Sequence, residues 1–527
     1  MRATGLRTML AIQTRTHRRG PLVWIVALIG GMIGTAAAVA ALYGTPEEIH
    51  GYAQAVTAGD ALVAINGRVE GIDSLGGVIQ DEFGFLAAFL LPLLGISLVA
   101  AVTRHEEESG RLEAILGGRV ARHVPVLAGL VIAAAAIAVT VAAFALGLIA
   151  VGVPTAGSIL YATSLGTLAF VFAGLAALLA QLMLHSRGVY AWSLLLLAVA
   201  YLLRGIGDVS HTWVSWLSPL GWAEKAAPFG AARWWTLLVP LAVGGLLATL
   251  AVLIAAHRDL GSSLIRGGAG PAQATTWLRS PLGLATSIHR SAILGWLAGA
   301  LVIAGMMGAL AQQFLDAVAG NPAMAQAIGM SGAQPEDGFV AVTQLYIAIV
   351  ASGYAVQVVG SLRAEEAAGR LEPRLAGTLS RMRWLAAHGL VIVAGLAVIV
   401  VVASVVLAAA TAWSMGAAVP LGSVVGAGLA YLPAELVVGG IALAVFGLRP
   451  RAFPAAWAIF AFIAFVALLG PGLRLAGWVL DLSPTTHVGN PPLGAVAAPP
   501  LVVLGALAAI LCAVAAVGFR HRGVPQG

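Results

Sequence analysis

The hydrophobic pattern of this chain consists of long apolar stretches separated by short polar segments that are rich in arginine. A helix needs about 20 apolar residues to cross a bilayer, and the pattern supplies twelve stretches of about this length. These stretches predict an all-α, polytopic membrane protein with twelve transmembrane helices. The expected spans are 22–43, 84–103, 124–151, 157–183, 189–206, 235–256, 292–314, 339–362, 385–413, 418–447, 454–475 and 498–518.

Arginine placement sets the expected orientation of these spans. Both terminal tails and every second connection are basic, and together they hold 23 of the 28 Lys and Arg residues. Because basic connections stay on the cytoplasmic side, both termini are expected in the cytoplasm. The first apolar stretch has the length of a span and follows a long Arg-rich lead, so we interpret it as a span and not as a cleavable signal peptide.

Composition supports the membrane interpretation. The chain has 527 residues, of which 60% are hydrophobic and 9% are charged, whereas a soluble chain is about 25% charged. The single cysteine, Cys512, lies in the last apolar stretch and excludes an internal disulfide framework. The net charge of +6 is interpreted as a topology signal, and no nucleic-acid partner is expected.

One charged motif occurs twice. Residues 104–113 read R-H-E-E-E-S-G-R-L-E and residues 363–372 read R-A-E-E-A-A-G-R-L-E, with seven identities at a constant shift of 259. Each copy lies between the second and third spans of its half, so the motif predicts an element that meets a two-fold partner. The identical positions are Arg104 and Arg363, Glu106 and Glu365, Glu107 and Glu366, Gly110 and Gly369, Arg111 and Arg370, Leu112 and Leu371, and Glu113 and Glu372.

Further matches extend the repeat at a shift of 265. Gly157-Ser158 recurs as Gly422-Ser423, and Leu217-Ser218-Pro219 recurs as Leu482-Ser483-Pro484. We therefore expect two parallel six-span repeats, an arrangement that is common in transporters. Duplication without transport is the alternative. The expected domains are a first half at 1–256, a cytoplasmic linker with an amphipathic segment at 257–291, and a second half at 292–527.

Both halves begin with a basic segment in which apolar residues alternate with arginines, at 2–19 and at 277–290. Such a pattern is typical of a short amphipathic helix at the inner membrane interface. A basic tail that only fixes topology would carry the same composition.

The doubled motif is expected to open a helix, because Leu112, Ile115 and Leu116 fall at helical spacing. An acidic cluster suits a helix N-terminus, and Glu107–Arg111 and Glu366–Arg370 have the i, i+4 spacing of an ion pair. The functional interpretation is a docking element that receives force from a cytoplasmic motor. The alternative is a solvated surface helix.

Glu435 is the only acidic residue deep in an apolar stretch, and Phe170 occupies the matching position of the first half. A charge at the bilayer centre costs roughly 2.5–3.5 kcal/mol on insertion scales, so such groups usually face a cavity or a partner. We expect Glu435 and Phe170 to lie on the cargo pathway, with Glu435 meeting a polar or cationic group or a proton. A structural hydrogen bond to a neighbouring span is the alternative. Pro433 is expected to bend the helix at this point.

The repeated Leu-Ser-Pro segment follows a cluster of aromatic and polar residues in each half. It contains Ser218 and Pro219 in the first copy and Ser483 and Pro484 in the second. A short re-entrant helix that gates the outer mouth is one interpretation, and aromatic anchoring at the outer interface is the other.

Several enzyme motifs are missing. A nucleotide-binding P-loop needs Gly-Lys-Ser/Thr, but the only lysine, Lys225, is followed by Ala226. The histidines show no metal-ligand spacing, and no Gly-x-Ser-x-Gly sequence occurs. We therefore expect no catalytic site, no metal and no cofactor in this chain.

Four features of this chain together resemble the ABC-2 class of ABC-transporter permeases. They are the two six-span halves, a Glu-Glu-x-x-Gly-Arg-Leu-Glu element in each half, an amphipathic lead before each half and a Leu-Ser-Pro segment in each half. More narrowly, the chain is similar to actinobacterial exporters of polyketide antibiotics that are linked to tetronasin resistance. The resemblance implies a multi-pass protein of the bacterial plasma membrane that supplies both membrane halves of an exporter.

The same resemblance implies the partners. Two copies of a separate ATP-binding subunit, which would bind ATP and Mg, are expected to dock on the cytoplasmic side. Residues 104–122 and 363–383 would be the coupling helices, and the seven shared positions of each motif would carry the docking. The cargo would be a hydrophobic or amphipathic compound, such as an antibiotic, that is taken from membrane lipid or the cytoplasm.

Two other classes compete with this interpretation. A proton-coupled secondary multidrug transporter also has twelve spans in two halves, but the connection at 104–123 lacks the Gly-x-x-x-Asp-Arg-x-Gly-Arg-Arg pattern typical of the major facilitator group. A scaffold for lipid or cell-wall assembly is the third interpretation.

Overall fold

The computed structural model describes residues 5–57, 63, 66–117, 120–265, 273, 275–319, 335–377, 379–470, 475–494 and 496–523. Within these residues the chain forms helices and connections, with no β-strand. Eleven of the helices are long and apolar enough to cross a membrane. The expectation of an all-helical, polytopic membrane protein is confirmed.

The number of spans stays a prediction. The expected span at 454–475 contains the apolar helix α21 (Pro454–Leu469), which has 16 residues and is shorter than a typical span. Residues 471–474, which would complete this span, lie outside the described residues.

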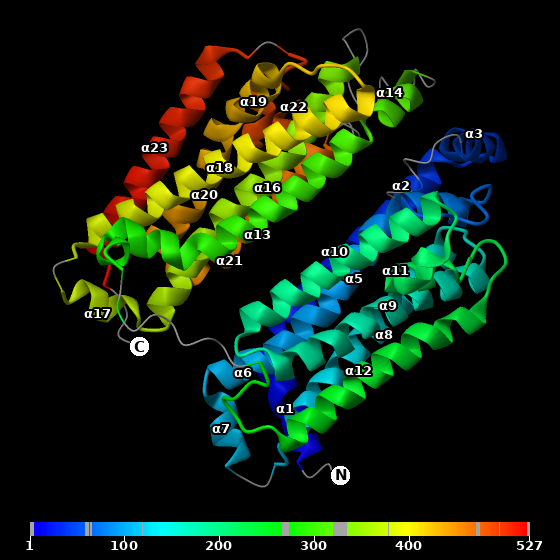
Figure 1. The fold of residues 1–527 in the computed structure, drawn as a ribbon, viewed down its shortest axis with the longest axis horizontal. Helices are drawn as coiled ribbons and strands as arrows, with labels where there is room; N and C mark the ends of the chain where they lie inside the picture. The colour runs from blue at the N-terminus through cyan, green and yellow to red at the C-terminus, as the bar shows by residue number, and fades with distance from the viewer. Residues whose placement is uncertain are drawn as a thin grey trace. The chain divides into compact units, whose positions relative to one another are not determined.

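The chain divides into two compact units, unit 1 at Met1–Ala269 and unit 2 at Gly270–Gly527. In unit 1, α9 packs against α5, α8 and α12 and is the most deeply buried of the apolar helices (Figure 1). The helices of unit 1 are α1 (Leu6–His17), α2 (Arg19–Leu42), α3 (Pro46–Thr57), α5 (Leu75–Val102), α6 (Arg104–Glu108), α7 (Arg111–Leu116), α8 (Val124–Ala150), α9 (Thr155–Leu182), α10 (Ser186–Val209), α11 (Pro219–Glu224) and α12 (Leu238–His257).

Glycines allow the helices of unit 1 to approach closely. A Cβ on Gly95 of α5 would lie 2.7 Å from the backbone oxygen of Ala169 in α9. A Cβ on Gly174 of α9 would lie 2.7 Å from the backbone oxygen of Gly244 in α12. Small residues at helix contacts are the usual means of packing between membrane helices, so these glycines fix α9 at the centre of the unit.

In unit 2, α16 packs against α13, α18 and α20, and α20 packs along α23 (Figure 1). The helices of unit 2 are α13 (Pro281–Ala309), α14 (Ala311–Ala319), α16 (Pro335–Ala367), α17 (Leu371–Leu375), α18 (Arg381–Met415), α19 (Leu421–Ala430), α20 (Leu432–Leu448), α21, α22 (Gly477–Leu480) and α23 (Ala498–His521).

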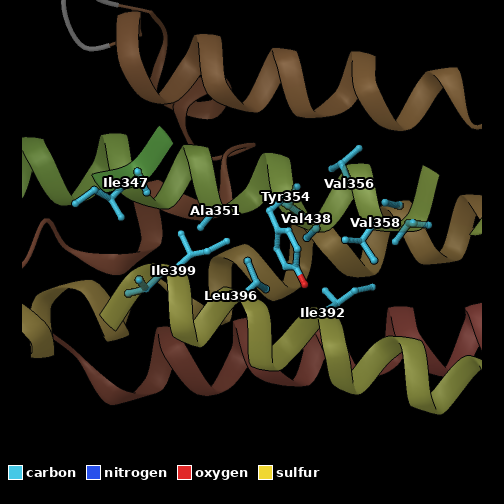
Figure 2. Close-up of a cluster of buried hydrophobic side chains, with 14 of the residues drawn as sticks. Ile347, Ala351, Tyr354, Val356, Val358, Ile392, Leu396, Ile399 and Val438 are labelled. Atoms are coloured by element: carbon cyan, nitrogen blue, oxygen red, sulfur yellow. The ribbon is translucent and has the colours of Figure 1, made fainter. Parts of the chain in front are cut away.

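Tyr354 lies at the centre of the core of unit 2. Its ring is fully buried among aliphatic residues of α16, α18 and α20, including Ile392 and Val438 (Figure 2). The hydroxyl donates a hydrogen bond to the backbone oxygen of Val391 at 2.9 Å, which satisfies the one polar atom of the side chain. A Cβ on Gly395 would lie 2.1 Å from that hydroxyl, so a glycine is required there.

Two local features can be compared with the sequence expectations. The helix is interrupted close to Pro433, because α19 ends at Ala430 and α20 begins at Leu432 with the proline in its first turn, and the bend expected there stays a prediction. The amphipathic lead of the first half forms the separate helix α1. The lead of the second half differs, because residues from Pro281 onward are the beginning of α13 and continue into the span.

Candidate coupling site

The doubled motif forms a helix–turn–helix in each unit. In unit 1, α6 and α7 meet at Gly110, which has a φ of +73°. In unit 2, α16 and α17 meet around Gly369, which has a φ of +68°. A residue in this left-handed region is most easily a glycine, and it ends the preceding helix. We call residues 104–116 elbow 1 and residues 363–375 elbow 2.

The expectation that the acidic cluster sits at a helix N-terminus is wrong for elbow 2. Glu365 and Glu366 belong to the last turns of α16, and the new helix starts only after Gly369. In elbow 1 the glutamates lie in α6, a five-residue helix that follows α5 directly. The glycine decides the boundary, because it stops the helix before the Arg-Leu-Glu part of the motif begins.

In elbow 1, the Glu106 side chain lies between α1 and α7. Its carboxylate receives hydrogen bonds from Arg111 Nη2 at 2.6 Å and Nε at 3.0 Å, and His17 Nε2 lies 2.8 Å away. The hydrogen bond to Glu106 raises the pKa of Arg111. Gln13, one turn before His17, donates to the backbone oxygens of Val102 and Pro125. The amphipathic helix α1 is thereby bound to the elbow.

Glu107 joins elbow 1 to the end of the last helix of unit 1. One carboxylate oxygen is 2.6 Å from Arg258 Nη2 and 2.9 Å from Arg104 Nη1, and the other accepts from the backbone nitrogen of Gly261 at 2.7 Å. Arg258 follows α12 immediately. The glutamate and both arginine side chains are less than one-tenth exposed, so this is a buried ion-pair network.

Elbow 2 repeats this arrangement with fewer partners. Glu366 is bound by both terminal nitrogens of Arg522, with Nη2 at 2.6 Å from Oε2. Arg522 follows α23 immediately, just as Arg258 follows α12. Glu365 accepts a hydrogen bond from Arg374 Nη1 at 2.6 Å. In both units, therefore, the second glutamate of the motif binds the arginine that follows the last helix.

The i, i+4 pairs expected from the motif are wrong. Glu107 pairs with Arg104 and Arg258, and Glu366 pairs with Arg522, while Arg111 reaches back to Glu106. The turn at the glycine rotates the following helix, so the spacing of an uninterrupted helix does not apply. Arg258 and Arg522 were missed from the sequence, although the dipeptides His257-Arg258 and His521-Arg522 close the two halves in the same way.

The remaining motif positions divide into two faces. Leu112 and Leu371 are buried, at 5% and 0% exposure, in the apolar clusters beneath the elbows. Arg104 is also buried and donates to the backbone oxygens of Leu184 and Ser262. The positions at the surface of the two units are Gly110, Arg111, Glu113, Arg370 and Glu372, with Arg363 and Gly369 half-buried.

Glu435 lies inside unit 2. Its side chain has 0% exposure, and among the described residues neither carboxyl oxygen has a hydrogen-bond partner. Tyr431, one turn earlier on the chain, is also fully buried, and no described residue bonds to its hydroxyl. Phe170, the matching residue of unit 1, is half-buried and its ring contacts Gly244 of α12. The two positions therefore differ in both chemistry and burial.

The Leu-Ser-Pro segments start short helices in both units. Ser218 caps α11 and donates to the backbone oxygen of Ala200 at 2.6 Å, and Pro219 is the first residue of α11. Ser483 contacts Thr485 Oγ1 at 2.8 Å, and Pro484 begins the 3-10 helix Pro484–Val488. Both serines are fully buried. Ser218 thereby ties the start of α11 back to α10, whereas the contact of Ser483 lies within its own segment.

The eleven apolar helices and the two internally paired elbows define a multi-pass membrane protein. The family model described as "Multidrug efflux system permease Rv1217c, C-terminal domain" matches residues 6–255 and 278–520. The chain is also 33% identical, over 533 residues, to "Multidrug efflux system permease protein Rv1217c" of Mycobacterium tuberculosis (strain ATCC 25618 / H37Rv). That match covers 99% of this chain and 95% of the relative. The chain belongs to this family of bacterial multidrug efflux permeases.

Proposed function

We propose that the chain is the membrane-spanning subunit of an ATP-driven ABC exporter of the ABC-2 class, powered by a separate ATP-binding subunit. Two copies of that subunit bind ATP and Mg and dock on the two elbows. The cargo is a hydrophobic or amphipathic compound of the antibiotic type. The observation that carries this proposal is the common plan of elbow 1 and elbow 2, which combines a buried acidic anchor with an exposed charged face.

The anchor makes each elbow a rigid attachment. Buried ion pairs join the elbow to the end of the last helix of its own unit, through Glu107–Arg258 in unit 1 and Glu366–Arg522 in unit 2. A force applied to the elbow is therefore passed to α12 or α23 as well as to the adjoining helices. In this proposal the shared glutamates transmit force and do not meet the partner themselves.

The exposed face supplies the docking contacts. Arg111 and Glu113 in elbow 1 correspond to Arg370 and Glu372 in elbow 2, and all four are exposed. Glu113 and Glu372 have no ion-pair partner among the described residues, so their charges are open to a partner. The same exposed pattern on two units suits a partner that is used twice.

The test is a docking experiment on the full chain, co-expressed with its candidate ATP-binding subunit. The variant Glu113→Lys with Glu372→Lys reverses one exposed charge on each elbow without touching the buried pairs. A desolvated charge pair across an interface is worth about 1.5 kcal/mol or more, so each reversal should weaken docking by at least about tenfold. Arg451→Glu, on a different cytoplasmic connection, is the matched control for a reversed surface charge.

Recovery of the ATP-binding subunit from detergent extracts measures docking, and cargo uptake by inverted vesicles measures transport. We expect the double variant to lose both while the control keeps both. Undiminished recovery with both charges reversed would show that the elbows do not dock the subunit. Uptake that follows a proton gradient and ignores ATP would assign the chain to the competing class, the proton-coupled secondary transporters.

A further inference from the structure

A small cavity with several polar side chains in its wall lies in unit 1, at the end of α5 that is remote from elbow 1. It has a volume of about 30 Å³, which is room for one or two groups of the size of a water molecule. Four helices contribute to its wall. The lining residues used below are Gln80 and Phe85 of α5, Tyr161 of α9, Tyr201 and Arg204 of α10, and Glu224 of α11.

The wall of the cavity presents hydrogen-bond acceptors that the rest of the described chain does not use. Gln80 Oε1, Tyr161 OH and Glu224 Oε2 are buried atoms with no hydrogen-bond partner among the described residues. Gln80 and Tyr161 are only 5% and 3% exposed. An amide oxygen and an ionised carboxylate oxygen can only accept, and a phenol can do both. A group that satisfies this site must therefore donate hydrogen bonds.

The charges around the cavity favour a cation. Arg204 Nη1 is paired with the other oxygen of Glu224 at 3.1 Å, and its guanidinium lies over the ring of Tyr201 at 4.5 Å. Asp81 and Asp208 do not line the cavity but are buried beside this cluster, at 2% and 6% exposure. The other nearby basic side chains, Arg68 and Lys225, are exposed and half-buried, so the buried charges are mainly acidic. Burial raises the pKa of Glu224 well above its usual value, and a cation beside Oε2 would stabilise the ionised carboxylate.

The aromatic residues complete the site. Phe85 and Tyr201 pack against each other with ring centroids 5.5 Å apart, and the ring of Tyr161 lines the same space. Aromatic faces attract ammonium groups within about 6 Å of the ring centroid. The cavity has room for an ammonium head group and not for a whole drug, so the apolar body of the ligand would extend out of it.

We propose that this cavity binds the protonated amine of a cationic amphipathic cargo, a subsite that rests on the proposed export function. Each N–H of the ammonium would donate to one of the acceptors of Gln80, Tyr161 and Glu224. The repeat places Gly426, Leu469 and Gly489 at the positions of Tyr161, Arg204 and Glu224, so the side chains of this subsite belong to unit 1 alone.

The test is direct binding to the purified full chain in lipid nanodiscs, without nucleotide or a second subunit. 2-Phenylethylamine is the probe, and 2-phenylethanol is the neutral probe of the same shape. Calorimetric titration at pH 7.5 should give saturable binding of the amine at least tenfold tighter than binding of the alcohol. Saturable binding of the amine that is no tighter than binding of the alcohol would overturn the proposal, and so would the absence of binding by either probe, which would assign the cavity to water.

Two variants test the residues. Glu224→Gln should weaken amine binding at least tenfold, and Glu70→Gln, which removes an exposed carboxylate paired with Arg233 in the same unit, should not. Tyr161→Phe removes a hydroxyl that no described residue uses, so the variant should fold normally. Its affinity for the amine should still fall several-fold. If Glu224→Gln fails to fold, Tyr161→Phe decides. Parental affinity in Tyr161→Phe and in any folded Glu224→Gln protein would overturn the proposal.

Binding to the isolated chain separates this subsite from the proposed export function. If the chain binds the amine but shows no ATP-dependent uptake with its candidate ATP-binding subunit, the result would count against the export function and would leave the subsite supported. ATP-dependent uptake of neutral compounds by a chain that does not bind the amine would support the export function and overturn the subsite.

Discussion

The ion pair formed by Glu366 and Arg522 should be the strongest interaction that holds elbow 2 to the rest of unit 2. Arg522 donates through both terminal nitrogens to the two oxygens of Glu366, and its Nε donates to the backbone oxygen of Gly447 at 3.0 Å. Its guanidinium also lies over the rings of Phe446 and Phe519, at 5.1 Å and 5.0 Å. The variant Glu366→Gln removes the negative charge and keeps the size of the side chain.

The expected loss of stability follows from burial. The side chains of Glu366 and Arg522 are 3% and 14% exposed, so the arginine is left as a largely buried cation. Removing one partner of a buried ion pair costs about 3–5 kcal/mol. We expect the lower end, about 3 kcal/mol, because the amide still accepts one hydrogen bond and the aromatic rings remain. In a unit of this size that corresponds to a fall in melting temperature of roughly 6–12 °C.

The assay is thermal unfolding of the full chain in detergent, with Glu372→Gln as the matched control. Glu372 belongs to the same elbow but is exposed, so its loss should change the free energy of unfolding by less than about 0.5 kcal/mol. Arg522→Gln and the double variant complete a mutant cycle, which should return a coupling energy of about 1–3 kcal/mol. Equal melting temperatures for Glu366→Gln and Glu372→Gln, with additive effects in the cycle, would refute the reasoning.

Three further predictions concern other parts of the chain. The purified chain should neither bind nor hydrolyse ATP, since Lys225 is not part of a P-loop; nucleotide binding in a calorimetric titration would contradict this. Gly447→Ala should lower the melting temperature of unit 2, because the new Cβ would lie 2.3 Å from the backbone oxygen of Ala515, whereas Gly505→Ala meets nothing within 4 Å and is the control. Glu435→Gln should lower export of cationic compounds and spare neutral ones at equal expression; equal loss of both, with a lower melting temperature, would assign Glu435 a structural role.

The helical architecture could be predicted from the sequence because hydrophobic stretches of span length carry that information locally. The break before Pro433 was also predictable from the local sequence, because proline lacks the backbone N–H that a helix interior needs. The helix after the motif of the first half also followed from the apolar spacing of Leu112, Ile115 and Leu116. Each of these features depends on residues that are close together along the chain.

The internal partners of the elbows could not be predicted in this way. Glu107 and Arg258 are separated by 151 positions, and Glu366 and Arg522 by 156, so no periodic pattern links them. The motif glutamates looked like a surface feature because charge runs usually are solvated. The one available signal was the recurrence of His-Arg at the end of the last helix of each half. This signal becomes meaningful only when the arginines are found against the elbows.

The long sequence separation of these pairs also sets an order of assembly during synthesis. Elbow 1 is translated early, but its Glu107 stays without Arg258 until the last helix of unit 1 has been made. Elbow 2 waits in the same way for Arg522. Since chains leave the ribosome at about 5–20 residues per second, each glutamate is without that partner for about 8–30 seconds. Closure of the pair therefore marks the completion of a unit. A chain truncated before Arg258 would leave Glu107 with Arg104 alone, and one truncated before Arg522 would leave Glu366 unpaired, which would expose the elbow to the quality-control machinery of the cell.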